Sequence, residues 1–207
     1  TLARLPDGLR ALHDDLQSLQ PLEQTGRLVR HFSGLDRDHG RHRHGIHRQL
    51  AHQGSPFGGR RKRGAYAQAI GRSRGGRTSK LHALTDSKGR PCVLLLTPGN
   101  INDIVMAPAL IAEAGRPIRR LLGDKGYDAN SLRSFLAARK TTAVIPSTAS
   151  RKTPIPHDAR AYRARNLVER MFCRLKDYRR VAIRYDKLAR NFLAGVLIAA
   201  ALTWWLN

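Results

Sequence analysis

The chain has 207 residues, with 38 Lys and Arg against 15 Asp and Glu, so its formal net charge is +23. A surface this basic attracts polyanions, and nucleic acid is the leading candidate partner. The two cysteines, Cys92 and Cys173, provide neither a disulfide framework nor a zinc-type spacing, which excludes a small secreted scaffold. The first residue is Thr rather than Met, which suggests a fragment or a processed end, and its surroundings lack a signal-peptide pattern.

The N-terminal third lacks the pattern of a folded core. Six of the nine His residues lie in residues 31–64, which contain almost no aliphatic side chains. Eleven Lys and Arg, and no acidic residue, lie between Asp38 and Asp86, in a stretch that includes GGRRKRG and GRSRGGR. Like charges without apolar residues are typical of disorder. We therefore predict a disordered or irregular segment 1–64 and a folded domain over residues 65–207.

From residue 65 the pattern alternates between strands and helices. KLHALTD and CVLLLTPG predict two strands joined by a turn at SKGRP, and the apolar run of the second strand indicates burial on both faces. Asn102 or Asp103 can cap a helix, which is followed by a strand at RRLLGD, a helix at DANSLRSFLAARK and a strand at TTAVIP. This alternation predicts an α/β fold.

Two further helices are predicted near the C-terminus. The first runs from about Ala161 to Tyr178, because one apolar stripe recurs at helical spacing. That stripe consists of Leu167, Met171, Phe172 and Leu175. The second, NFLAGVLIAAALTWWLN, carries no charge but is shorter than the ~20 residues that span a bilayer. We predict that it is a buried helix and that the protein has no membrane partner.

Candidate chemistry begins with Asp124, where the strand RRLLG ends and the turn DKGYD begins. Functional side chains gather at such strand ends in open α/β sheets, although an Asp there is more often a turn former or a helix cap. The long helix adds Tyr162, Arg165, Glu169 and Lys176, at offsets 0, 3, 7 and 14 along one stripe. In an ordinary basic helix, such a stripe is far more often a solvated face with an Arg165–Glu169 pair.

The spacing Tyr-x2-Arg-x3-Glu-x6-Lys, here YRARNLVERMFCRLK, resembles the C-terminal signature of bacterial insertion-sequence transposases of the DDE class. Four further segments resemble successive blocks of the family-five branch of these proteins, in the same order. They are AIGRSRGGRTSKLHALTD, LTPGNINDIVMA, LLGDKGYDA and RRVAIRYDKLARNFLAG. The resemblance covers residues 65–207, about two thirds of the chain.

This resemblance implies an RNase H-like fold, a mixed sheet with flanking helices. In it two Asp and one Glu hold two Mg²⁺ ions that support cutting and joining of DNA. Carried over to this chain, Asp124 is the second carboxylate and Glu169 the third, both catalytic and both metal ligands. Tyr162, Arg165 and Lys176 would hold DNA beside them. The implied partners are the insertion-sequence ends and target DNA, with a homodimer as a candidate assembly, in the bacterial cytoplasm at the nucleoid.

His82 and Asp103 also fall inside blocks that resemble the family. The physical case for either as a site residue is thin. His82 can point into the core from its strand, and Asp103 can simply cap a helix.

The sequence departs from the family where the first carboxylate should stand. That place holds GIHRQLAHQGSPFGGRRKRG, with His47, Arg48 and Gln49 at the expected position and no Asp. We therefore expect a core without its first strand and a transposase that is inactive. A one-base shift of the reading frame lets residues 47–57 encode IDSSLIKAHRS, and residues 12–24 encode YTTTYNRFNRWS. Both resemble the family's N-terminal blocks, so we interpret the N-terminal third as out of frame.

Two other functions remain open at the level of sequence. The net charge alone permits a non-catalytic basic protein that binds nucleic acid. A His-rich metal-binding protein would instead use His44, His47 and their neighbours. Convergent carboxylates at Asp124 and Glu169 would favour the transposase, and distant ones the plain binding protein.

Overall fold

The computed structural model describes residues 43–51, 68–74 and 76–205, and within 43–51 it describes the side chains of Gly45 and Ile46. Most of the predicted segment 1–64, and residues 12–24 of the frameshift interpretation, lie outside the described residues. Six strands belong to the described sheet. They are β1 (Arg43–Ala51), β2 (Gly71–Ser73), β3 (Gly76–Thr85), β4 (Pro91–Pro98), β5 (Arg120–Gly123) and β6 (Thr142–Val144).

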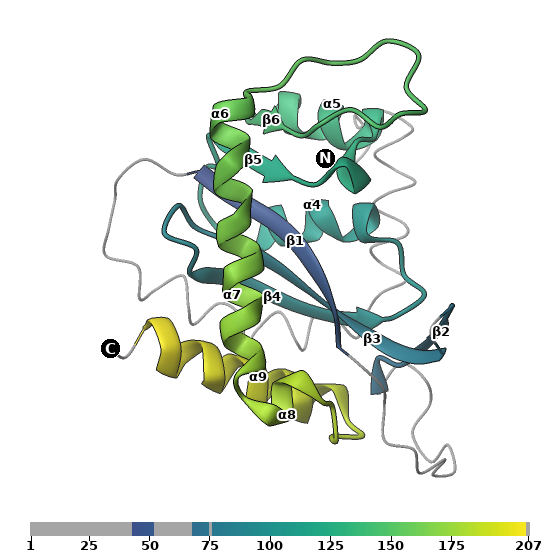
Figure 1. The fold of residues 1–207 in the computed structure, drawn as a ribbon, viewed down its shortest axis with the longest axis vertical. Coiled ribbons are helices and arrows are strands. Elements are labelled where there is room, and N and C mark those ends of the chain that lie inside the picture. Colours follow the sequence, from purple (N-terminus) through teal and green to yellow (C-terminus); the bar gives the residue numbers. More distant parts are fainter. Residues whose placement is uncertain (1–42, 52–67, 75, 206–207) are drawn as a thin grey trace, which may run out of the picture.

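The strands form a mixed sheet in the order β4-β3-β1-β5-β6 (Figure 1). β3 is antiparallel to both β4 and β1, whereas β1, β5 and β6 are parallel to one another. The short β2 pairs with the beginning of β3. This is the RNase H-like mixed sheet that the resemblance implied.

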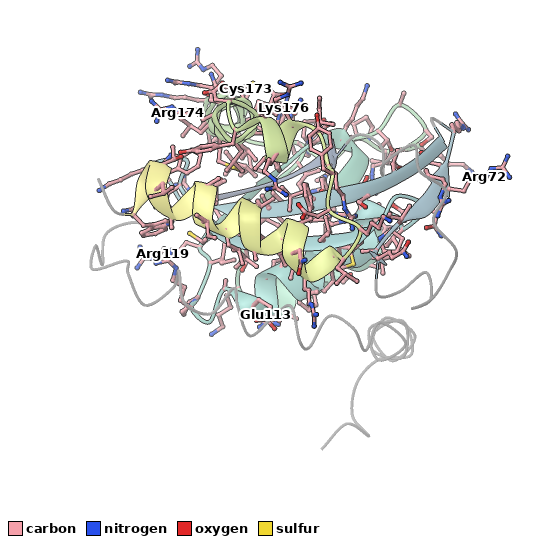
Figure 2. All side chains as sticks on the ribbon, turned by 90° about the horizontal axis from the view of Figure 1, so that it is seen from below. Arg72, Glu113, Arg119, Cys173, Arg174 and Lys176 are labelled. Carbon is pink, nitrogen blue, oxygen red and sulfur yellow. The ribbon has the colours of Figure 1, made fainter. Side chains whose placement is uncertain are left out.

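Helices cover both faces of this sheet (Figure 1). They are α4 (Asp103–Glu113), α5 (Asn130–Ala138), α6 (Ala159–Tyr162), α7 (Asn166–Lys176), α8 (Arg179–Ala182) and α9 (Ala189–Trp204), with 3-10 turns η2 (Lys125–Tyr127) and η3 (Arg163–Arg165). One core lies between the sheet and α7 and α9, and a second lies between the sheet and α4 and α5. Figure 2 shows α7 end-on above the sheet and α9 running along it.

The strand pattern explains these two cores. In β4, Leu94 and Leu96 face α7 and α9, whereas Val93 and Leu95 belong to the core under α4 and α5. Alternate residues of a strand point to opposite faces, so a continuous apolar run fills both layers. The predicted hairpin and the burial of its second strand are therefore confirmed.

The expectation that the core lacks its first strand is wrong. β1 occupies the middle of the sheet, antiparallel to β3 and parallel to β5, so neither neighbour has an unpaired edge there. A central strand is held by backbone hydrogen bonds on both sides, and these do not depend on side-chain type. Ile46, 1% exposed, contributes an apolar side chain to the core under α4 and α5.

The Gly- and Arg-rich segment GRSRGGR was expected to be disordered, but it contributes β2 and the start of β3. Gly76, at φ 95°, makes the turn between them, which a residue with a Cβ adopts only at a cost. The helix predicted from about residue 161 is present as the consecutive segments α6, η3 and α7. The helix capped by Asn102, the strands β5 and β6, helix α5 and the C-terminal helix α9 are confirmed as well. α9 is buried on one face only, because Ile198 is 61% and Leu202 45% exposed. Within the described ranges, no helix has the length and apolar character needed to cross a membrane.

Candidate active site

Asp124 lies directly after β5, at the carboxyl end of the parallel part of the sheet. Its backbone is extended, and its Oδ1 accepts a hydrogen bond of 2.7 Å from the Lys125 amide, so it caps η2. The predicted turn-former role is therefore real. It does not exclude a second role, because a carboxylate has two oxygens and Asp124 is partly exposed.

Glu169 is brought to the same region by the packing of α7 across β1. Val168 lies so closely over Gly45 that a Cβ on residue 45 would overlap it. Gly45 is paired with Leu122 of β5, and Asp124 is two residues beyond Leu122, about 6.6 Å along the strand. Since Glu169 follows Val168, the turn of α7 that carries Glu169 crosses the sheet near the end of β5.

Tyr162 is held against β5 by α6 and η3. Ala161 packs with Leu122 of β5 and Val144 of β6, and Tyr162 packs against that cluster. Asp158 caps α6 by accepting a hydrogen bond of 2.8 Å from the Ala161 amide. The phenol ring is therefore held over the strand that ends at Asp124.

The electrostatics of Tyr162 report on both carboxylates. Burial raises the pKa of Tyr162, the positive charge of Arg165 lowers it, and the negative charges of Asp124 and Glu169 raise it further. Both carboxylates are thus within electrostatic reach of one phenol. Arg165 donates a hydrogen bond of 2.7 Å to Glu169, and its guanidinium lies 5.7 Å from the centre of the Tyr162 ring.

The structure therefore pairs Arg165 with Glu169, packs Tyr162 against β5, and places Asp124 at the end of that strand and Lys176 farther along α7. Lys176 is seven residues after Glu169, about 10.5 Å along the axis. Its side chain points away from the sheet, as does that of Arg174 (Figure 2). The stripe predicted from the sequence is one exposed face, but only its first three residues lie beside Asp124.

Asp128 is a supporting residue that sequence reasoning missed. Its side chain is fully buried and accepts hydrogen bonds from Arg133, from Arg151 and from the Thr148 amide, at 2.8 to 2.9 Å. These bonds, chiefly those from Arg151, hold the pKa of Asp128 well below its usual range, although burial opposes them. The segment after Asp124 is thereby tied to the loop that leads to α6. The second Asp of DKGYD hinted at this role, but a partner 23 residues away leaves no local pattern.

His82 and Asp103 occupy structural positions. His82 is fully buried in β3, and its Nε2 lies 2.8 Å from Thr97 Oγ1. Asp103 begins α4, forms an ion pair of 3.2 Å with Lys80, and leaves the capping to Asn102. The expected core position of His82 is therefore confirmed, whereas the expected capping role of Asp103 is wrong, because the side chain of Asn102 caps α4 and Asp103 pairs with Lys80 instead.

The donor set does not fit a two-metal site. Asp124 and Glu169 offer the hard oxygen ligands that Mg²⁺ prefers, but across the described ranges no group of three or more His, Cys, Asp or Glu could hold a metal. His47 follows Ile46, whose partner in β5 is Gly123, so β1 runs beside Asp124 there. The sequence of β1, RHGIHRQLA, contains no carboxylate.

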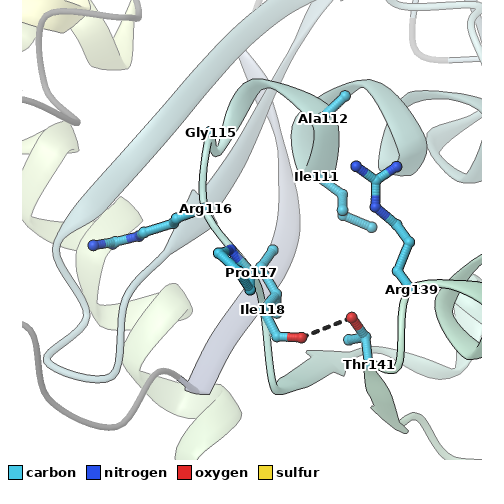
Figure 3. A pocket seen from close by; sticks show the side chains of 8 residues that line it. All are labelled: Ile111, Ala112, Gly115, Arg116, Pro117, Ile118, Arg139 and Thr141. Atoms are coloured by element: carbon cyan, nitrogen blue, oxygen red, sulfur yellow. Dashed lines mark hydrogen bonds between the residues drawn. The ribbon is translucent and has the colours of Figure 1, made fainter.

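A separate pocket of about 500 Å³ lies at the opposite end of β5, where Ile118 and Arg139 line it (Figure 3). Thr141 donates a hydrogen bond of 2.7 Å to the Ile118 carbonyl there. Arg116 points away from Arg139 (Figure 3), so the two guanidinium groups do not converge on one ligand. Ligands in open α/β sheets bind at the carboxyl ends of the strands, which favours the Asp124 side.

Comparison with known proteins identifies the family of the chain. Residues 51–204 match a family model described as a transposase DDE domain. The chain is similar to a protein of Brucella ovis named as a transposase for insertion sequence element IS6501, with 36% identity over 128 residues, 61% of this chain and 98% of that relative. It is also similar to a protein of Burkholderia cepacia named as a transposase for insertion sequence element IS402, with 33% identity over 138 residues, 61% of this chain and 63% of that relative. No solved structure matches the chain.

Proposed function

The chain belongs to the transposase DDE-domain family, and on that premise we propose that it is an insertion-sequence transposase that binds DNA but does not cut it. Asp124 and Glu169 are the second and third carboxylates of its site, and β1 supplies no first one. The observation that carries the proposal is the position of β1, which runs beside Asp124 with His47, Arg48 and Gln49 in its sequence.

Charge explains why the loss of one carboxylate matters. Two Mg²⁺ ions bring four positive charges, whereas Asp124 and Glu169 supply two negative ones. Arg165 already uses one oxygen of Glu169, and Lys125 follows Asp124 directly. We therefore expect weak occupancy by Mg²⁺ and no productive cleavage. A frameshift upstream of residue 65 accounts for a β1 that lacks an Asp.

DNA binding, in contrast, does not need the metal. Arg and Lys on the exposed face of η3 and α7 neutralise phosphates whether or not ions are bound. Arg165 and Lys176 lie on the flank of this face that carries Glu169, so they hold a strand along α7 next to the carboxylates. The bacterial nucleoid is the expected place of action. A basic protein that only binds nucleic acid is the less favoured function, because binding alone does not require two carboxylates within electrostatic reach of one phenol.

The test is DNA affinity as a function of salt. Each phosphate contact contributes a slope of roughly −0.9 to the dependence of log K on log salt. The double variant Arg165→Gln, Lys176→Gln should reduce the slope by about 1.8. Glu169→Gln should leave affinity equal or stronger, because it removes a negative charge from the DNA face.

The matched control is Arg139→Gln, Lys140→Gln, which removes one Arg and one Lys at the C-terminal end of α5, beside the opposite pocket. It should change the slope of log K against log salt by less than about 0.9, the contribution of one phosphate contact. A flat salt dependence of the parent chain, or equal effects of the two double variants, would overturn the proposed DNA face.

A further inference from the structure

An apolar groove between α8 and α9 lies outside the site described above. It has a volume of about 590 Å³ and a floor formed by Val181, Phe192 and Ala199, all buried. Such a volume is within the range of roughly 300–1,000 Å³ that holds small ligands. The groove is an unusual feature on a surface that is otherwise strongly basic.

The walls of the groove are large apolar side chains in contact with solvent. Tyr178 is 37% exposed, Ile198 61% and Leu202 45%. Thr203 donates its hydroxyl proton to the Ala199 carbonyl at 2.7 Å, so the Tyr178 hydroxyl donates to Thr203 across 3.2 Å. The phenol ring is therefore fixed as one wall and does not need to be ordered by a ligand.

The rim of the groove is positive. Arg179 and Arg180 both line it, and the Arg180 side chain is 76% exposed. Asp186 is the acidic residue of the lining, and it is paired with Arg180 at 3.4 Å, which leaves Arg179 to set the sign of the charge. A second copy of this chain would bring the same arginines together. An occupant with a flat apolar part and a negative charge complements both the walls and the rim.

We propose that this groove binds one unpaired nucleotide of the DNA substrate, with its base between Tyr178 and the aliphatic wall and its phosphate on Arg179. This inference rests on the proposed DNA-binding function. Bases stack readily on aromatic side chains, and Arg next to such a platform is typical of single-strand recognition.

The position of the groove fits a continuous path for DNA. α8 follows α7 directly, so the groove begins where the helix that carries Glu169 and Lys176 ends (Figure 1). Lys176, the last residue of α7, lies about 10.5 Å along the helix from Glu169, and Tyr178 follows two residues later. At 3.4 Å per nucleotide step, the helical part of this path corresponds to roughly three steps of a strand. The unpaired nucleotide therefore lies a few positions from the bond nearest the carboxylates.

The test uses the full chain and three probes: a blunt duplex, the same duplex with one extrahelical nucleotide, and that duplex with the extrahelical nucleotide made abasic. The chain should prefer the extrahelical nucleotide over the blunt duplex by at least about fivefold, as expected for stacking of one base. The abasic probe, which keeps the phosphate, should lose most of that preference. Equal affinity for the abasic and intact probes would overturn the proposal.

The variant Gly195→Leu fills the groove without threatening the fold, because a Cβ at Gly195 meets no atom within 4 Å and Leu favours the helix more than Gly does. It should abolish the preference and keep the affinity for blunt duplex. The matched control Ala137→Leu, on the exposed face of α5, should keep both. Retention of the preference by Gly195→Leu would refute the assignment of the groove.

Two further outcomes separate this inference from the proposed function. If the parent chain binds blunt duplex in a salt-dependent way but shows no preference, the groove assignment fails and the DNA-binding function stands. If it binds no probe, the proposed function itself fails. Sedimentation of the parent and of Gly195→Leu tests whether a second copy of this chain occupies the groove instead. A dimer that dissociates in the variant, with base preference unchanged, would make the groove a protein interface and overturn the proposal.

Discussion

Val168 of α7 rests directly on the backbone of Gly45 in β1, with no room for a Cβ atom between them. This contact sets how closely the helix that carries Glu169 approaches the strand that runs beside Asp124. The backbone pairs this polar and His-rich segment with β3 and β5, and Gly45, which has no side chain, and the buried Ile46 let the helices pack on it.

Gly45→Ala should destabilise the fold by about 1–3 kcal/mol, because an added methyl group must displace Val168 or the backbone of β1. Urea denaturation measures the loss. Gly126→Ala is the control, since a Cβ there meets nothing within 4 Å, and it should change stability by less than about 0.5 kcal/mol. Equal stabilities of the two variants would show that α7 does not pack on β1 at this position.

The pKa of Tyr162 should fall in Asp124→Asn and in Glu169→Gln, because each change removes a negative charge that raises it. Removal of Glu169 also leaves the positive charge of Arg165 uncompensated, which lowers the pKa further. The titration is followed by tyrosine absorbance or NMR, with Tyr162→Phe used to identify the signal. Glu113→Gln, on α4, is the control. A pKa of Tyr162 that stays unchanged in Asp124→Asn or in Glu169→Gln would mean that the two carboxylates do not converge on this phenol.

The sequence could predict most of the sheet and the candidate site. The apolar run of β4 indicates a strand buried on both faces, and the spacing of the polar residues of α7 indicates which face of that helix is exposed. β1 was missed because the backbone, rather than a side-chain pattern, holds it between β3 and β5. The Asp128 cluster was missed because its partners come from segments that only the fold brings together. The groove beside α9 was missed because an uncharged helix was expected to be fully buried, whereas Ile198 and Leu202 face solvent.

Asp128→Asn should destabilise the fold at neutral pH, because it leaves Arg133 and Arg151, whose side chains are 14% and 17% exposed, without their counter-charge. The pKa of Asp128 is lower in the folded chain than in the unfolded one. Its stabilising contribution is therefore complete above an ordinary Asp pKa of about 3.9 and is lost as the pH falls toward the lower folded value. Urea denaturation of the parent and of Asp128→Asn at several pH values from neutral to acidic should show that the difference between their free energies of unfolding decreases as the pH falls. A difference that stays constant with pH would rule out an ionised Asp128 as the cause.

Arg184→Lys should also destabilise the fold, by about 1.5–3 kcal/mol, the contribution of hydrogen bonds to a charged group. Arg184 is 1% exposed, and its guanidinium donates to Ser79 and to the Gln68 carbonyl while lying 5.1 Å from the centre of the Phe192 ring. A lysine keeps the charge but cannot reach all of these acceptors. Thermal or urea unfolding measures the effect, with Arg190→Lys on exposed α9 as the control. Similar losses of stability in the two variants would show that the buried guanidinium of Arg184 does not hold residues 68–79 against the C-terminal helices.

The central claim is that this chain retains two carboxylates of a DNA-cutting site, lacks the first, and therefore binds DNA without cutting it. The most direct measurement is Mg²⁺-dependent strand cleavage of a plasmid that carries the encoding element with its flanking DNA. The parent chain is compared with a chain whose reading frame is restored over residues 12–24 and 47–57, and with the restored chain bearing Glu169→Gln. We predict cleavage by the restored chain alone. Cleavage by the parent at a matching rate, abolished by Asp124→Asn, would contradict the account and would mean that another residue serves as the first ligand.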